Sequence, residues 1–169
     1  KKGGIMLLKI NKFLSSDNVS MTVNENFVID DEEFLEETRL DKNILLSGEI
    51  FKIDDSLTFS GRIEYTLTDE CARCLKEFNN RINYKFQASL VHKEDMESDE
   101  VQMVVTDGII KMDDIIKQLI YLSLPMKSLC DKDCRGICPN CGANLNNEKC
   151  QCVNSLTDPR FDKLKDLLI

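Results

Sequence analysis

The segment LTFSGRIEYTLT at residues 57–68 decides the fold class, because apolar and polar side chains alternate along its whole length. A period of two is typical of a β-strand with one buried face and one exposed face. The segment INYKFQASL at residues 82–90 alternates in the same way, and residues 44–53 are rich in β-forming side chains. Between the two alternating segments lies Cys71-Ala72-Arg73-Cys74. We therefore predict an antiparallel meander of three strands, with a pair of cysteines at the turn of its second hairpin.

Weaker signals extend this sheet toward both ends of the chain. Residues 6–14 are consistent with a strand or an extended arm, whereas residues 24–41 give no clear assignment. Asp107-Gly108 is a favourable hairpin dipeptide between two short apolar segments. These signals add strands to the meander and leave the stretch before residue 44 undefined.

Two helices are expected. Apolar residues at helical spacing follow Asp113 and Asp114, either of which could cap the helix, and Pro125 ends it. A second, short helix is expected to begin at Asp158-Pro159. The residues between these helices include few large apolar side chains, so this stretch needs cross-links to hold a structure.

The composition indicates the cellular compartment of the protein and argues against some classes of function. The 169 residues carry a formal net charge of −8, which opposes non-specific binding to nucleic acid. The chain shows no secretory signal and no apolar run of membrane-spanning length, and we therefore expect a cytoplasmic protein that does not contact a membrane. In a reducing compartment, clustered cysteines are more often metal ligands than disulfides.

Eight cysteines, in four closely spaced pairs, are the strongest chemical signal. Zinc is held by four thiolates in a tetrahedron, and two cysteines separated by two residues reach one ion from a tight turn. Cys138-Pro139-Asn140-Cys141-Gly142 has the sequence of such a turn, since proline fixes one dihedral angle and glycine permits the reversal after the second ligand. We expect two zinc ions per chain. The candidate ligands are Cys71, Cys74, Cys130, Cys134, Cys138, Cys141, Cys150 and Cys152.

Three other uses of these cysteines are disfavoured. Disulfides conflict with the expected compartment. The spacing Cys134-x3-Cys138-x2-Cys141 matches an iron–sulfur motif, but such enzymes need a long scaffold of alternating strands and helices. A thioredoxin-like redox pair would begin a helix, whereas Cys71 and Cys74 lie at a β-turn.

The eight cysteines can be divided between the two zinc ions in two ways. In the local arrangement, the last four cysteines close one site, and Cys71 and Cys74 join Cys130 and Cys134. In the crossed arrangement, the hairpin pair joins Cys138 and Cys141. The cost of loop closure favours the local arrangement.

We therefore predict an α+β fold with an antiparallel, barrel-like β-sheet, short helices and a cysteine-rich zinc-binding C-terminal module. Residues 6–125 form the β-rich domain with the Cys-x-x-Cys hairpin. Residues 126–169 form the zinc-binding module, with the C-terminal helix packed on it.

Nothing else in the sequence predicts catalysis. His92, the only histidine, lies in an acidic stretch without a nucleophile beside it. No glycine-rich phosphate loop is present, and a closed four-thiolate site leaves no open position for a substrate. We expect no enzyme activity and no small-molecule substrate.

The chain resembles a known bacterial family at several of these motifs. The shared features are Cys71-Ala72-Arg73-Cys74-Leu75, Leu124-Pro125, the run from Cys134 to Asn146, Cys150-Gln151-Cys152 and Asp158-Pro159-Arg160. Together they resemble the YceD family, which is named for accumulation of large-subunit ribosomal RNA. The resemblance implies a non-enzymatic factor in ribosome assembly or ribosomal RNA processing. Its expected partner is a ribosomal protein or a large-subunit precursor particle.

Two routes of contact follow from the charges. The basic residues Lys127, Lys132, Arg135 and Lys149 could make a local contact with RNA. Alternatively, acidic residues such as those at 94–100 could face a basic ribosomal protein, which we favour because it uses the acidic excess. A different class of function, a zinc-bearing protein-interaction adaptor unrelated to the ribosome, fits the same charge.

Overall fold

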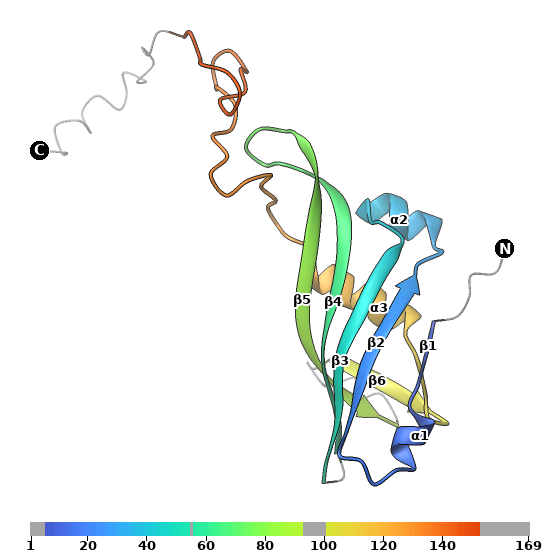
Figure 1. Ribbon diagram of the computed structural model, residues 1–169. Coiled ribbons are helices and arrows are strands. Elements are labelled where there is room, and N and C mark those ends of the chain that lie inside the picture. Colours follow the sequence, from blue (N-terminus) through green and yellow to red (C-terminus); the bar gives the residue numbers. More distant parts are fainter. Residues whose placement is uncertain (1–5, 55, 93–100, 153–169) are drawn as a thin grey trace, which may run out of the picture.

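A long, curled β-sheet dominates the structure (Figure 1). The computed structural model describes residues 6–54, 56–92 and 101–152, and within these residues the sheet has seven strands in the order β1-β7-β6-β5-β4-β3-β2. The strands are β1 (Leu7–Lys9), β2 (Ser20–Val28), β3 (Asn43–Ile53), β4 (Ser56–Glu70), β5 (Glu77–Val91), β6 (Val101–Thr106) and β7 (Ile109–Lys111). The predicted meander is confirmed as β3-β4-β5, with its cysteine pair between β4 and β5.

The prediction of an antiparallel sheet is correct for every described pairing except one. Strands β5 and β6 are parallel, with Ala88 opposite Val101 and Val91 opposite Val104. The sheet is therefore mixed, and it curls into a half-barrel. Alternation along a strand reveals which face is buried but not the direction in which the strand runs. The sequence therefore could not reveal that β5 and β6 are parallel.

Three helices lie within the described residues: α1 (Asn11–Leu14), α2 (Glu32–Thr38) and α3 (Asp113–Ser123). Helix α3 buries Ile116, Leu119 and Ile120 on the concave side of the sheet. Its expected aspartate cap is wrong, because the capping position is Met112 without a side-chain bond. The Asp113 carboxylate instead accepts a hydrogen bond of 3.1 Å from the backbone N–H of Met6.

The stretch before residue 44 acquires its structure from contacts that are distant in sequence. Only Leu7–Lys9 of the expected N-terminal strand is extended, and it pairs with β7. Residues 24–41, which had no assignment, contain the end of β2 and helix α2. Asp31 caps α2 by accepting the N–H of Phe34 at 3.1 Å. The helix expected at Asp158-Pro159 lies outside the described residues.

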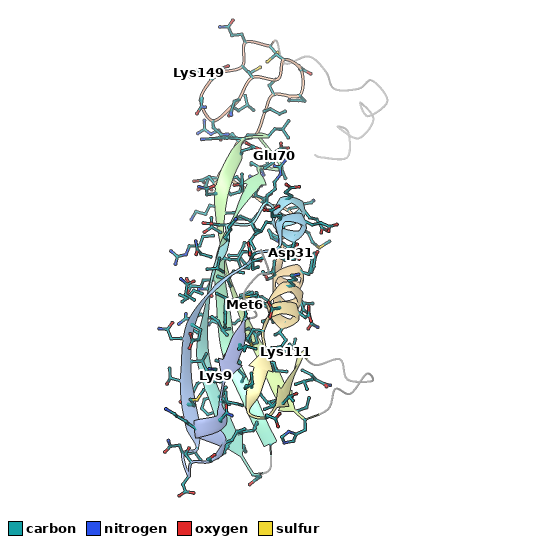
Figure 2. All side chains as sticks on the ribbon, turned by 90° about the vertical axis from the view of Figure 1, so that its right-hand side faces the viewer. Met6, Lys9, Asp31, Glu70, Lys111 and Lys149 are labelled. Carbon is teal, nitrogen blue, oxygen red and sulfur yellow. The ribbon has the colours of Figure 1, made fainter. Side chains whose placement is uncertain are left out.

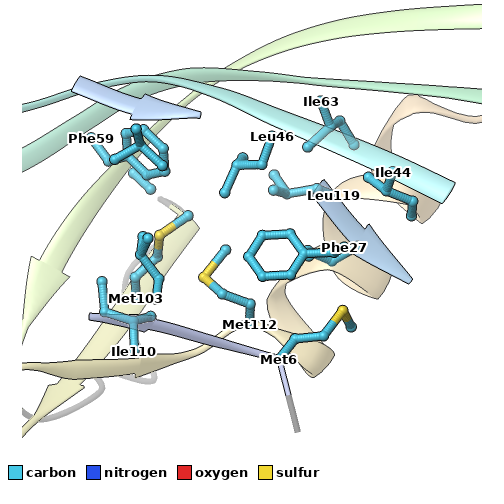
Figure 3. Packing of buried hydrophobic residues seen from close by; sticks show 14 of the residues in the cluster. Met6, Phe27, Ile44, Leu46, Phe59, Ile63, Met103, Ile110, Met112 and Leu119 are labelled. Carbon is cyan, nitrogen blue, oxygen red and sulfur yellow. The ribbon is translucent and has the colours of Figure 1, made fainter. Parts of the chain in front are cut away.

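The core fills the space between the concave side of the sheet and α3 (Figure 3). Phe59 is fully buried, and its ring meets Phe86 edge-on at 5.4 Å. Gly48 and Gly61 lie opposite each other on β3 and β4. A Cβ atom at Gly61 would lie 3.1 Å from the Phe59 ring, and one at Gly48 would lie 2.4 Å from the carbonyl oxygen of Ser60. These two glycines make the room that the aromatic ring occupies.

Within the described ranges, no helix is long and apolar enough to cross a membrane.

Candidate metal centres

The cysteine pair of the β4–β5 hairpin forms a tight turn. Cys71 and Cys74 are separated by Ala72 and Arg73. The N–H of Leu75 donates to the carbonyl of Cys71 at 2.9 Å, and the N–H of Cys71 donates to the carbonyl of Lys76 at 3.0 Å. Leu75 adopts a left-handed backbone with φ of 58°. The turn thereby brings both thiols to the same side of the chain.

A second turn has the same hydrogen-bond pattern. The N–H of Gly142 donates to the carbonyl of Cys138 at 2.9 Å, and the N–H of Cys138 donates to the carbonyl of Ala143 at 2.8 Å. Gly142 has φ of 73°, so glycine stands where the hairpin has leucine. The sequence reveals the turn at Cys138 through its proline and glycine, but it gives no such sign at Leu75.

The structure gathers the eight thiols into two clusters of four. The hairpin cluster contains Cys71, Cys74, Cys130 and Cys134, and the distal cluster contains Cys138, Cys141, Cys150 and Cys152. Within each cluster, the four sulfur atoms lie within 4.8 Å of one another. This grouping is the local arrangement and not the crossed one.

Three of the four sulfur–sulfur distances match the edge of a tetrahedral thiolate site, and the fourth is shorter. Zinc–sulfur bonds of about 2.3 Å give sulfur–sulfur edges of about 3.8 Å in a tetrahedron. In the hairpin cluster, the Sγ atoms of Cys71 and Cys134 are 3.7 Å apart, and those of Cys74 and Cys130 are 3.6 Å apart. In the distal cluster, the Cys150 Sγ lies 3.7 Å from that of Cys141 and 3.2 Å from that of Cys138. All four distances are far longer than a disulfide bond of about 2.05 Å.

The electrostatics of both clusters favour a cation. The backbone N–H of Cys130 is the largest cause that lowers the pKa of Cys71 to about 6, and the N–H of Cys141 lowers the pKa of Cys138 to about 6. The adjacent thiol of Cys74 instead raises the pKa of Cys130 to about 12. Four sulfurs so close together cannot all ionise alone, because their charges repel. A divalent cation at the centre would remove that repulsion.

Backbone contacts join the hairpin to the cysteine-rich segment. The N–H of Ala72 donates to the carbonyl of Ser128 at 2.9 Å, and the N–H of Ile137 donates to the carbonyl of Arg73 at 3.1 Å. The guanidinium of Arg73 donates to the carbonyl of Cys134 at 2.8 Å. Gly136 lies against Arg73, where an added Cβ would come within 3.0 Å of its carbonyl oxygen.

Asn146, which lies between Cys141 and Cys150 of the distal cluster, contacts the hairpin cluster. Its side-chain amide donates to the Sγ of Cys134 at 3.3 Å, and its carbonyl oxygen accepts the N–H of Arg135 at 2.7 Å. Sequence reasoning missed the roles of Arg73, Ser128 and Asn146 at the site. The only available signal was their position one to five residues from the motifs.

The two clusters differ in exposure. In the hairpin cluster, Cys71, Cys74 and Cys134 are all buried, and Phe78, Leu129 and Ile137 pack against them. In the distal cluster, only Cys138 is buried, and Cys141 is exposed. Solvent and reagents therefore reach the distal thiols more easily.

The other candidate residues do not converge on a site. His92 is exposed at the end of β5, and residues 94–100 lie outside the described residues. The four basic residues Lys127, Lys132, Arg135 and Lys149 are all exposed on the cysteine-rich segment.

Fold and site together define a half-barrel protein with two clusters of four thiols. One cluster joins the longest hairpin to the cysteine-rich C-terminal segment, and the other lies within that segment. The sequence of the chain is also similar to that of known proteins. The sequence profile of the family described as large ribosomal RNA subunit accumulation protein YceD matches residues 59–168. The chain belongs to the YceD family.

The chain is also similar to individual proteins, one of which carries the family's name. An uncharacterized protein of Mycobacterium bovis is 30% identical over 141 residues, which cover 79% of this chain and 67% of that protein. An uncharacterized protein of Mycobacterium leprae is 28% identical over 133 residues, covering 74% of this chain and 59% of that protein. The chloroplastic YCED homolog 1 of Arabidopsis thaliana is 38% identical over 52 residues, which cover 31% of this chain and 16% of that protein. No solved structure matches the chain.

Proposed function

We propose that this protein is a non-enzymatic, zinc-binding factor that supports accumulation of large-subunit ribosomal RNA during ribosome assembly. Membership of the YceD family carries the proposal, since the family is named for that role. The name of the chloroplastic relative states the same role for that protein.

Zinc has a structural part in this proposal. The eight cysteines are its ligands, four to each of two ions, and the two thiol clusters support this assignment. Zinc supplies four strong bonds per site, and they replace a hydrophobic core in the cysteine-rich segment. The hairpin site then fixes residues 126–169, a separate module in this proposal, to the β-rich domain of residues 6–125.

The proposed partner is a large-subunit precursor particle in the cytoplasm. Such a particle offers both RNA and basic proteins, and an acidic chain with a net charge of −8 is attracted to the latter. Helix α2 adds to this excess with Glu32, Glu33, Glu36 and Glu37, which lie on the described part of the surface.

Cosedimentation tests the proposal. Lysate from the protein's own host is separated on a sucrose gradient, and the protein is detected in each fraction. We expect it in fractions that contain precursors of the large subunit. A protein found only at the top of the gradient would contradict the proposal, and capture of non-ribosomal proteins instead would favour the adaptor.

A further inference from the structure

The convex side of the four long strands is polar, and none of the described helices or strands covers it. In Figure 2, helices α2 and α3 lie on the opposite side of the sheet. Alternate residues of β2, β3, β4 and β5 point outward, and we call this the outer sheet face. Uncharged polar side chains predominate on it, among them Thr22, Asn24, Asn26, Ser60, Asn83 and Gln87.

The charge of this face differs from that of the whole chain. It carries three cations, Arg62, Arg81 and Lys85, and four carboxylates. Glu49 and Glu64 lie among the cations, whereas Glu70 and Glu77 lie opposite each other at the hairpin end of the face. Glu64 is engaged by Arg81 at 2.8 Å, and Glu49 accepts the hydroxyl of Ser20 at 2.6 Å. The area immediately around Arg62 and Lys85 is therefore net positive, on a protein whose formal charge is −8.

Arg62 and Lys85 face each other directly across β4 and β5. Like charges in this position destabilise an antiparallel pair. The Nε atom of Arg62 donates to Ser47 at 3.2 Å, and no carboxylate within the described ranges pairs with either cation. The two groups thus keep unused donors directed outward.

A shallow depression adjoins this pair. It has a volume of about 490 Å³, and its lining includes Arg62, Lys85, Ser47, Ser60 and Gln87. A guanidinium, an ammonium, hydroxyls and an amide form a set of donors suited to phosphate oxygens. Gly48 and Gly61 also line it, so the sheet backbone is open to a ligand there.

We propose that the outer sheet face around Arg62 and Lys85 holds the phosphate backbone of a ribosomal RNA segment. This inference rests on the proposed function, because it names the RNA contact within the precursor particle. The overall negative charge opposes long-range attraction, so the contact forms only after the protein has docked. The phosphates neutralise two cations that otherwise repel each other.

A photo-crosslinking amino acid at Gln87 tests the occupant of this face. After irradiation of precursor particles, we expect crosslinks to large-subunit RNA from Gln87 and none from the same group at Lys12, which lies in α1 and is not part of the outer sheet face. Crosslinks from Gln87 to a protein, or to nothing while the protein still cosediments, would overturn the inference. Failure of the unmodified protein to cosediment would instead count against the proposed function.

The double variant Arg62→Gln/Lys85→Gln tests how much these two cations contribute to binding of the precursor particle. A plot of the logarithm of the binding constant against the logarithm of the salt concentration should become shallower by about 1.5, because two phosphate contacts are lost. Binding near 0.1 M salt should weaken at least about tenfold. The matched variant Lys9→Gln/Lys12→Gln removes the same charge elsewhere and should leave binding unchanged. The first variant should keep or slightly raise its Tm, because it removes a like-charge pair. Equal loss of binding in both variants would contradict the inference.

Discussion

Leu75 and Gly142 occupy the same position in two copies of one turn. Each follows the second cysteine of a Cys-x-x-Cys pair, with φ of 58° and 73°, and each donates its N–H to the carbonyl of the first cysteine at 2.9 Å. A leucine in the left-handed region costs roughly 1–2 kcal/mol, whereas glycine adopts it freely. The hairpin turn therefore holds a strained backbone that the distal turn avoids.

The first prediction concerns that strain. Gly142→Leu should weaken zinc binding at the distal site by about fivefold or more, since about 1 kcal/mol corresponds to that factor. No atom lies within 4 Å of an added Cβ at Gly142, so the cost is conformational and not steric. Competition with a chromogenic chelator measures the affinity. The reciprocal variant Leu75→Gly should bind zinc at least as tightly as the parent, and a large loss there would contradict the account of the turn.

The order of zinc release follows from exposure. We expect a chelator or a mild oxidant to remove one zinc quickly and the second slowly, because Cys141 is exposed whereas Cys71 is fully buried. Mass spectrometry of the native protein resolves the one-zinc intermediate. Cys138→Ser should abolish the fast phase alone, and simultaneous loss of both ions from the parent would be inconsistent with two separate sites.

Acid should also release zinc. Metal binding requires thiolates, and hydrogen bonds lower the pKa of Cys71 and Cys138 to about 6. A lowered pKa favours the folded, metal-binding form above the ordinary thiol value of 9.0, and this contribution is lost as the pH falls toward 6. Zinc affinity measured between pH 8 and pH 5 should therefore fall steeply. A flat profile would mean that the thiols are not the ligands.

Metal removal should also expose the proposed module boundary. Limited proteolysis of the full chain in excess chelator is expected to cut within residues 126–152 and to leave a resistant fragment near residues 6–125. With zinc, the same segment should resist cleavage. Rapid digestion of the sheet after chelation would show that the two parts do not fold independently.

The core prediction tests the glycine pair. Gly48→Ala should destabilise the fold by about 1–3 kcal/mol or more, because its Cβ would lie 2.4 Å from backbone that cannot rotate away. Gly61→Ala should cost less, since the nearest atom, at 3.0 Å, belongs to the Phe86 side chain. Urea unfolding monitored by tyrosine fluorescence gives both values. The reverse order would contradict the described packing.

Sequence reasoning succeeded where the signal was local. Alternation over residues 57–68 and 82–90 predicted β4 and β5, and Asp107-Gly108 predicted the β6–β7 hairpin. It failed where distant contacts decide the structure. The parallel pairing of β6 with β5 leaves no trace in the side-chain pattern, and β2 is an edge strand with polar residues on both faces.

At the thiol clusters too, the sequence predicted the local features and missed the contacts between distant segments. Cysteine spacing identified both turns and favoured the grouping of thiols that the structure shows. The supporting contacts of Arg73 and Asn146 depend on the approach of segments more than ten residues apart, which spacing cannot reveal.

The ratio of large-subunit to small-subunit ribosomal RNA in cells depleted of this protein tests the central claim most directly. The account predicts that the ratio falls on depletion and recovers when the wild-type protein is restored, but not when a variant lacking both Cys71 and Cys74 is restored. An unchanged ratio after complete depletion would contradict it.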